Sequence, residues 1–204
     1  MWSDECSVER GKGGNIIWVW GHAVDKWKPS HVETYKKGKQ MSIMVSAAFW
    51  GEGERSDLLI LEHDFESKKH RYSANSYLDI LEQLVLPNYT DDLIFMQDNA
   101  LIHTARKVKA WFIEHGINVT DWPLYSPDLN PIKHAWKRLK DTASKMFPDL
   151  WKSKGESEAD RTAMEEALKE AWATIPVSFF EELVESMPRR IQACIDADGW
   201  HTKY

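Results

Sequence analysis

The sequence predicts an α/β fold in which a mixed five-stranded sheet carries helices on both faces. Three observations predict it. Strand-like segments separated by turn clusters open the chain, a short apolar run without polar alternation stands in its middle, and helical periodicity dominates the remainder. At 204 residues the chain can bury a core of its own. We expect a single domain over 1–204, with a core over about 1–150 and a C-terminal helical extension over 151–204.

The first strands are expected to be antiparallel. Residues 2–10 are typical of a strand, and the glycine-rich turn cluster 11–15 separates them from a second strand at 16–20, which favours a hairpin. A polar loop over 21–40 leads to a third strand at 41–49.

A turn and a helix are predicted next. Gly51 and Gly53 mark a turn before the apolar run 58–61. From 76 to 86 the apolar residues follow helical spacing, and Pro87 ends this helix.

Two parallel strands and a helix between them follow. The apolar run 93–96 lacks polar alternation, as expected for a parallel strand covered on both faces, and 117–120 is a second short strand. Thr104 can cap the intervening helix, which ends near Gly116.

Helices complete the chain. Pro131 suits the first turn of a helix that runs to about residue 146, and further helices are expected at about 158–174 and 177–186. Three antiparallel strands followed by alternating helices and parallel strands fit a ribonuclease H-like sheet.

Composition narrows the function classes. Hydrophobic residues make up 43% of the chain, and no apolar stretch approaches the ~20 residues that span a bilayer. The sequence predicts no signal peptide and no membrane partner, so we expect a protein that is not secreted. Cys6 and Cys194 lack metal-type spacing, which favours a reducing compartment such as the nucleus or cytoplasm. The net charge of −6 argues weakly against a generic nucleic-acid coat.

An acidic residue follows the apolar run at the place where α/β sheets bind ligands. Asp98 lies at the carboxyl end of a predicted parallel strand. Taken alone, a carboxylate there is more often a cap or turn residue. The residues around Asp98 and elsewhere in the chain form motifs that are more specific than one carboxylate. These sequence blocks are Ser3-Asp4-Glu5, Gln97-Asp98-Asn99-Ala100, His103-Thr104-Ala105, Asp121-Trp122-Pro123, Ser126-Pro127-Asp128-Leu129-Asn130-Pro131-Ile132 and Ser186-Met187-Pro188-Arg189-Arg190.

These blocks resemble the catalytic core of the Tc/mariner superfamily of DNA transposases, and the likeness spans nearly the whole chain. The resemblance implies a DDE-type domain that cuts and rejoins DNA by phosphoryl transfer with two divalent ions, Mg²⁺ or Mn²⁺. It implies that Asp4 and Asp98 are catalytic metal ligands, and that transposon-end and target DNA are partners. A homodimer is a further expectation. Relatives carry helix-turn-helix modules ahead of this domain, and nothing in this sequence corresponds to them, so we expect no sequence-specific DNA binding.

The third acidic position departs from the family. Thirty-four residues lie between Asp98 and Lys133, and the family carries a metal-binding carboxylate where Lys133 stands. An ammonium about 4 Å from a divalent ion would be repelled by about 8 kcal/mol at an effective dielectric of about 20. Alternatively the ammonium pairs with Asp4 and Asp98 in place of the metal, or it lies on a solvated helix face. His134 points about 100° away on a helix and is a poor substitute ligand.

Three neighbours of these residues are expected to be structural. Glu5 should point away from Asp4, because adjacent strand residues face opposite sides. Asp128 lies in a proline-bounded turn that its side chain would stabilise. His103 is expected to be hydrogen-bonded rather than a metal ligand.

Basic clusters are candidate phosphate contacts. A charge run is usually a solvated face, but two clusters flank the candidate acids in sequence, which favours DNA contact. Their residues are Arg106, Lys107, Lys109, Lys137, Arg138 and Lys140.

Two other functions stay open. A degenerate relative could keep the fold and bind only DNA or protein partners, which Lys133 favours. A ribonuclease acting on RNA–DNA hybrids shares the expected fold but lacks the motif match.

Overall fold

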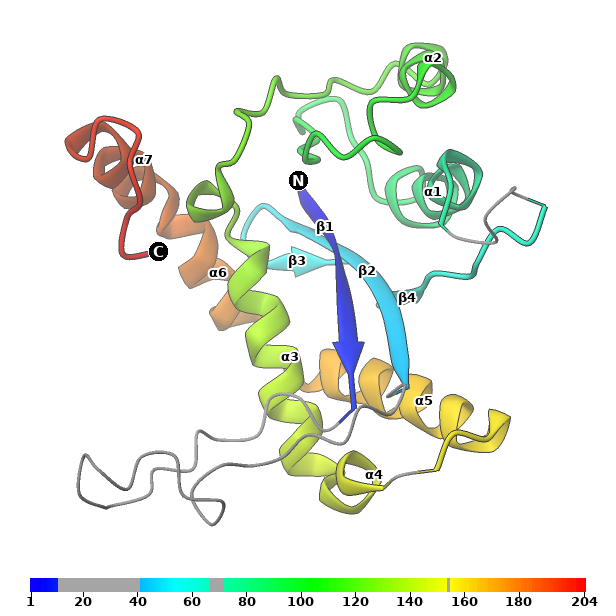
Figure 1. Cartoon of the computed structure of the whole chain (residues 1–204). Helices are drawn as coiled ribbons and strands as arrows, with labels where there is room; N and C mark the ends of the chain where they lie inside the picture. The colour runs from blue at the N-terminus through cyan, green and yellow to red at the C-terminus, as the bar shows by residue number, and fades with distance from the viewer. Residues whose placement is uncertain (11–40, 67–71, 154) are drawn as a thin grey trace, which may run out of the picture.

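The computed structural model describes residues 1–10, 41–66, 72–153 and 155–204 (Figure 1). The predicted hairpin strand at 16–20 and its flanking loops lie outside these residues. No helix in the described part of the chain is long and apolar enough to cross a membrane.

The sheet is built around one long antiparallel pair. Strand β1 (Trp2–Glu9) pairs with β2 (Ser42–Trp50) along its whole length. Two short strands, β3 (Glu54–Arg55) and β4 (Leu59–Ile60), also pair antiparallel with β2. The turn between β2 and β3 has Gly53 at φ 96°, in the left-handed region that glycine reaches without strain. The predicted strands at 2–10 and 41–49 are therefore confirmed.

The predicted count of five strands is not confirmed, because the described sheet has four. The expected parallel strands at 93–96 and 117–120 are present as isolated parallel bridges, Trp2 with Met96 and Phe95 with Val119. Extended pairing stops after Met96 because the Asp98 carboxylate accepts a hydrogen bond from the Ala100 backbone and turns the chain.

The helices follow the predicted pattern with local changes. The helix expected at 76–86 begins after a Ser73 capping box and continues as a π-helix. The helix after Thr104 has Ala105 at its N-cap position and no side-chain cap, so the expected Thr104 cap is wrong. Thr104 Oγ1 donates instead to the Ala100 carbonyl. The bounds are α1 Ala74–Ile80, η2 Leu81–Val85, α2 Arg106–Glu114, η3 Pro127–Leu129, α3 Ile132–Met146, α4 Pro148–Lys152, α5 Glu158–Thr174, α6 Val177–Glu185 and α7 Met187–Asp196.

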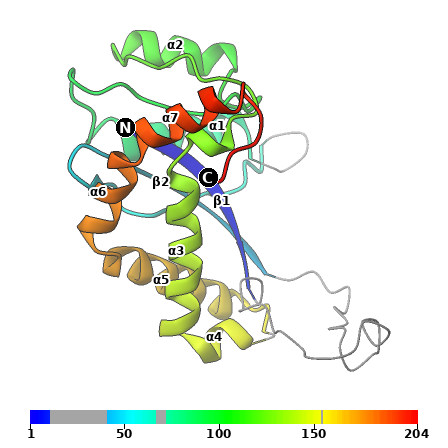
Figure 2. The same cartoon turned by 90° about the vertical axis from the view of Figure 1, so that its left-hand side faces the viewer.

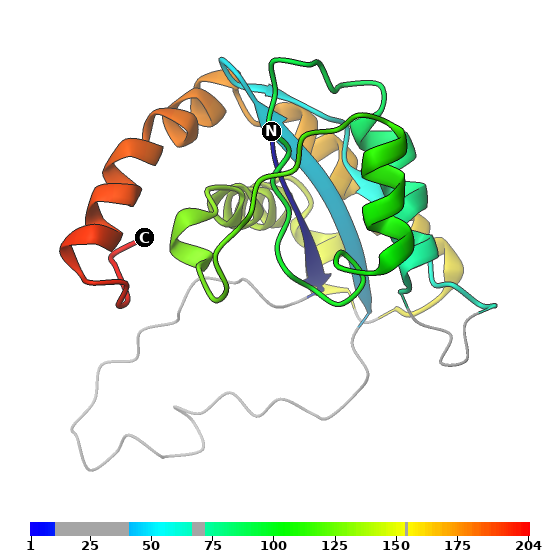
Figure 3. The ribbon, with the colours of Figure 1, turned by 90° about the horizontal axis from the view of Figure 1, so that it is seen from above.

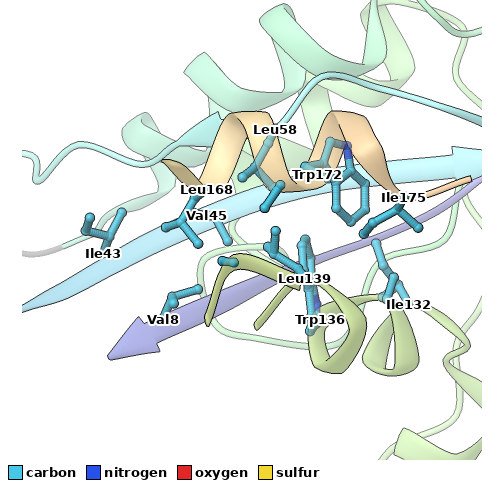
Figure 4. Packing of buried hydrophobic residues seen from close by; sticks show 14 of the residues in the cluster. Val8, Ile43, Val45, Leu58, Ile132, Trp136, Leu139, Leu168, Trp172 and Ile175 are labelled. Carbon is cyan, nitrogen blue, oxygen red and sulfur yellow. The ribbon is translucent and has the colours of Figure 1, made fainter. Parts of the chain in front are cut away.

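The alternation of β2 divides the core into two layers. Ile43, Val45 and Phe49 face a cluster built with α3, α5 and α6, as Figure 4 shows for the labelled side chains of β2, α3 and α5. Ala48 faces the other way, into a cluster built with α1, η2 and α2. Helices thus cover both faces of the sheet, α1 and α2 on one and α3 and α5 on the other (Figures 1 and 3).

The end of the chain returns to the start of α3. Helix α7 follows α6 away from the sheet, and the last residues fold back beside the entry to α3 (Figure 2). Thr202 donates hydrogen bonds from its backbone N and Oγ1 to Asp128 Oδ2, both at 2.7 Å. Asp128 therefore ties the C-terminal segment to the turn before α3, as its predicted turn role requires.

We expect Leu139→Ala to lower the free energy of unfolding by about 2–5 kcal/mol, because Leu139 is fully buried between α3 and the sheet. Urea denaturation measures this change. Ile113→Ala is the matched control, since Ile113 is 82% exposed and its truncation should cost less than about 0.5 kcal/mol. Equal losses in the two variants would contradict this packing.

Candidate functional site

The first candidate acid is buried and already bound to a cation. Asp4 lies on the β1 face that packs against α3, and its side chain is 4% exposed. Lys133 Nζ donates to Asp4 Oδ2 at 2.7 Å, and the Trp136 indole Nε1 donates to the same oxygen at 2.8 Å. Two donors therefore hold one carboxylate oxygen of the predicted metal ligand.

Helix α3 presents both donors because of their spacing. Lys133 and Trp136 are three residues apart, so they share a face of the helix. Ile132, Leu139 and Trp136 pack this helix on the sheet, which fixes its first turn beside β1. The Lys133 side chain is 43% exposed, yet its ammonium ends on Asp4, so the alternative of a lysine on a solvated face is wrong.

The electrostatics of Asp4 reflect burial and this pairing. Burial raises the pKa of Asp4, and the Lys133 ammonium and the hydrogen bonds from Lys133 and Trp136 offset only part of that rise. A buried carboxylate without such donors would carry a large desolvation penalty. Lys133 therefore stabilises the charged form of Asp4.

The second candidate acid lies in register with the first. Trp2 and Met96 pair in a parallel bridge between neighbouring segments. Asp4 follows Trp2 by two residues, and Asp98 follows Met96 by two residues. Burial raises the pKa of Asp4 and the charge of Lys133 offsets part of that rise, whereas the hydrogen bond from His103 is the main cause that lowers the pKa of Asp98, with a small contribution from Lys133. The Lys133 charge therefore acts on both carboxyls.

His103 holds Asp98 from the other side. Its Nδ1 lies 2.7 Å from Asp98 Oδ1, and its Nε2 lies 3.2 Å from Glu5 Oε2 in an ionic contact rather than an aligned hydrogen bond. The Tyr77 ring covers the imidazole with 4.1 Å between centroids, and the Tyr77 hydroxyl donates to Gln97 at 2.7 Å. His103 is the hydrogen-bonded residue that the sequence predicts, and Glu5 points away from Asp4.

The charge of His103 follows from these partners. Burial alone would lower the pKa of His103, but its hydrogen bond to Asp98, its ionic contact with Glu5 and the charges of both carboxylates outweigh burial and raise the pKa to about 10. The hydrogen bond from His103 in turn holds the pKa of Asp98 below its usual value. An imidazolium therefore bridges two carboxylates from different segments.

His134 faces away from the acids. Its Nδ1 lies 3.2 Å from Nη2 of the buried Arg190, whose Nη1 donates to the Asp128 carbonyl at 2.9 Å. Burial and the charge of Arg190 lower the pKa of His134. The prediction that His134 does not replace the missing acid agrees with this placement.

The predicted DNA contacts divide between two helices. Arg106, Lys107 and Lys109 lie exposed on α2, and Lys137 lies exposed on α3. Because α2 and α3 cover opposite faces of the sheet, the two clusters do not form one continuous helix face. Lys107 Nζ donates to Asn75 Oδ1, and the guanidinium carbon of Arg138 lies 5.6 Å from the centre of the Phe179 ring. Lys140 is half-buried and contacts Cys6.

Comparisons with known proteins identify the family. The DDE superfamily endonuclease family matches residues 25–154. The Tc1 transposase of Caenorhabditis elegans is 32% identical over 206 aligned positions, which cover 100% of this chain and 70% of that protein. The chain belongs to the Tc/mariner superfamily of DDE transposases. The Tcb1 transposase of Caenorhabditis briggsae is also 32% identical, over 208 positions, with the same two shares.

Solved transposase structures share the fold. The catalytic domain of the Mos1 mariner transposase matches with a TM-score of 0.59 at 23% identity, covering 79% of this chain and 76% of that one. A pre-cleavage Mos1 transpososome matches with a TM-score of 0.67 at 20% identity, covering 98% of this chain and 56% of that chain. The mixed α/β fold of this transposase domain is therefore similar to the ribonuclease H-like catalytic domain of Mos1.

The residues of this transposase domain do not fit a two-ion site as they stand. The Mos1 catalytic domain has been solved with Mn and with Mg. Here Asp4 Oδ2 already accepts two hydrogen bonds, and the third position supplies an ammonium instead of an oxygen ligand. Among the residues described, no group of three His, Cys, Asp or Glu side chains could hold a metal ion. Hard divalent cations need several oxygen ligands, so this donor set is incomplete.

Sequence reasoning missed two parts of the site. Trp136, which belongs to no predicted site, packs in the core and also donates to Asp4. Its position three residues after Lys133 is the signal that could have revealed this. The bridge from Asp98 through His103 to Glu5 left no such signal, because it joins side chains that only the folded sheet brings together.

We expect the stability of this domain to fall as pH rises from about 6.5 to about 10, because His103 is charged only in the folded protein over that window. The stabilising contribution of the charged His103 is complete below the pKa of His103 in the unfolded chain. It is lost as the pH rises through the pKa of His103 in the folded protein. His103→Gln should remove this part of the pH dependence, on the order of a few kcal/mol.

Urea denaturation at a series of pH values with chelator present measures both proteins. NMR titration of the His103 ring gives an independent reading in the parent chain. Parallel stability curves for parent and variant, or a ring that titrates near pH 6.5, would show that the imidazole is neutral.

Proposed function

We propose that this chain is a transposase-derived DNA endonuclease and strand-transfer domain whose two-metal phosphoryl transfer is impaired by Lys133. Family membership supports the DNA-directed chemistry. The observation that carries the impairment is the 2.7 Å contact between Lys133 Nζ and Asp4 Oδ2. The roles of Asp4 and Asp98 as catalytic acids are part of this proposal, with Lys133 as a degenerate third position.

The physical argument concerns charge and lone pairs. A divalent ion at Asp4 would have to displace an ammonium that is already in contact, or accept it as a close neighbour at a cost of several kcal/mol. Displacing it would leave the Lys133 charge without its buried partner. Asp98 is restricted too, since its Oδ1 accepts hydrogen bonds from His103 and from Ala100. We therefore expect weak affinity for Mg²⁺ or Mn²⁺.

The alternative function is a binding module without catalysis. The same ion pair favours it, because the pair satisfies Asp4 without metal and leaves the fold intact. The module would bind DNA through the basic residues of α2 and α3, or bind a protein partner. Catalysis in the parent chain is the property that separates the two functions.

We expect the parent chain to nick supercoiled plasmid poorly in Mn²⁺, and Lys133→Glu to nick it at least tenfold faster, because the variant restores an oxygen ligand at the third position. Agarose gel electrophoresis of the plasmid measures the rate. Lys145→Glu is the matched control, since it makes the same charge change on an exposed site of the same helix and should nick like the parent.

Calorimetric titration with Mn²⁺ extends this test. Lys133→Glu should bind the ion more tightly than the parent and Lys145→Glu. If the parent nicks as fast as Lys133→Glu, the impairment is wrong. If neither protein nicks while both bind DNA, the binding-module function is favoured.

We expect Lys137→Ala to weaken DNA binding similarly for all sequences and to reduce the salt slope of log affinity by about 1, because one phosphate contact is lost. Fluorescence anisotropy at several salt concentrations measures this. Lys145→Ala controls for a lysine further along α3. An unchanged slope for Lys137→Ala would remove that residue from the DNA surface.

Transposon-end DNA is the partner we propose, as a Mos1 transposase is known in a paired-end complex with a left transposon end. A homodimer, a single domain over 1–204 and a nuclear or cytoplasmic location remain predictions of the sequence.

A further inference from the structure

The loop before α3 displays an aromatic side chain. Tyr125 is 98% exposed, and its neighbour Leu124 is 67% exposed. The loop follows α2 and the segment of Val119, and it leads into α3, which carries Lys133 (Figure 1). A large ring in full contact with solvent contributes nothing to the core, so packing does not explain why an aromatic residue stands at this position.

The backbone of Tyr125 is strained. Its φ is 55°, and among the described residues only Tyr125 and Asp198 have positive φ without being glycine. A bulky residue in the left-handed region costs about 1 kcal/mol or more, and such strain concentrates at ligand-binding positions. Burial of the ring does not offset this cost, because the ring is not buried.

The loop is fixed at both ends. Upstream, Asn99 Nδ2 donates to the Trp122 carbonyl at 2.7 Å, and Asn99 follows Asp98 directly. Downstream, Asp128 accepts two hydrogen bonds from Thr202, and Arg190 donates to the Asp128 carbonyl. Tyr125 lies three residues from each anchor, within ~10 Å of backbone reach. The backbone of Tyr125 is therefore held between two anchors, one of which is bonded to the residue that follows Asp98.

We propose that Tyr125 is a stacking platform for an unpaired DNA base next to the site. This inference rests on the proposed DNA-directed function and adds to it the recognition of single-stranded or distorted DNA. An exposed ring offers its faces to a base, and stacking does not depend on the base sequence.

The surrounding charge favours DNA over a protein partner. Lys137 and Arg138 lie exposed in the first turns of α3, which follows this loop. A basic surface beside a single aromatic ring is typical of proteins that follow a phosphate backbone and stack its bases. A protein contact would need a wider apolar surface than Leu124 and Tyr125 provide.

Tyr125→Ala tests this inference in the full chain, with Tyr125→Phe as the variant that keeps the ring. The probes are a blunt DNA duplex and the same duplex with a single-stranded overhang that carries a fluorescent adenine analogue. Tyr125→Ala should bind the overhang DNA about 5- to 150-fold more weakly than the parent and lose the quenching of the analogue. Tyr125→Phe should bind within about twofold of the parent.

Affinity for the blunt duplex should be the same in all three proteins. Ile113→Ala controls for loss of an exposed apolar side chain on α2 and should behave like the parent. Equal overhang binding by parent and Tyr125→Ala overturns the stacking site while DNA binding stands. A parent chain that binds neither DNA overturns the proposed function and this inference together. A Tyr125→Ala variant altered only in self-association places the ring in a protein interface and overturns the inference.

Discussion

The ion pair between Lys133 and Asp4 is the interaction on which the site depends. It joins β1 of the central strand pair to the first turn of α3. The Trp136 indole donates a second hydrogen bond to the same Asp4 oxygen. An unpaired carboxylate at this depth would be costly, so the lysine makes a buried Asp4 compatible with a stable fold. The same pairing removes the oxygen from other uses. One contact thus both stabilises a buried carboxylate and occupies its oxygen.

The second acid shows the same principle. His103 brings a positive charge between Asp98 and Glu5, under the ring of Tyr77. Two internal cations therefore face three carboxylates within this part of the molecule. In this chain the protein itself provides the positive charge that these carboxylates contact.

Much of the fold could be predicted from the sequence because it depends on local periodicity. The strand at 41–49 alternates, and the helix after Pro131 repeats its apolar residues every third or fourth position. The length of the two parallel strands was overestimated, because an apolar run predicts burial but not how many residues pair with a neighbouring strand. The family motifs predicted Asp4, Asp98 and Lys133, and the structure shows Lys133 on Asp4. The bridge through His103 required coordinates, because its members are distant in sequence and meet only across the sheet.

The register of β1 against β2 carries a consequence for how this domain can evolve. Asp4 lies opposite Ala47, and Glu5 lies opposite Ser46. A single-residue insertion or deletion near the start of β1 would turn every following side chain to the other face. Deletion of one residue would bring Glu5 opposite Ala47, beside the indole and ammonium of α3, and would bring Cys6 to the place of Glu5. Such a deletion would keep a carboxylate beside α3 but remove the one beside the imidazole.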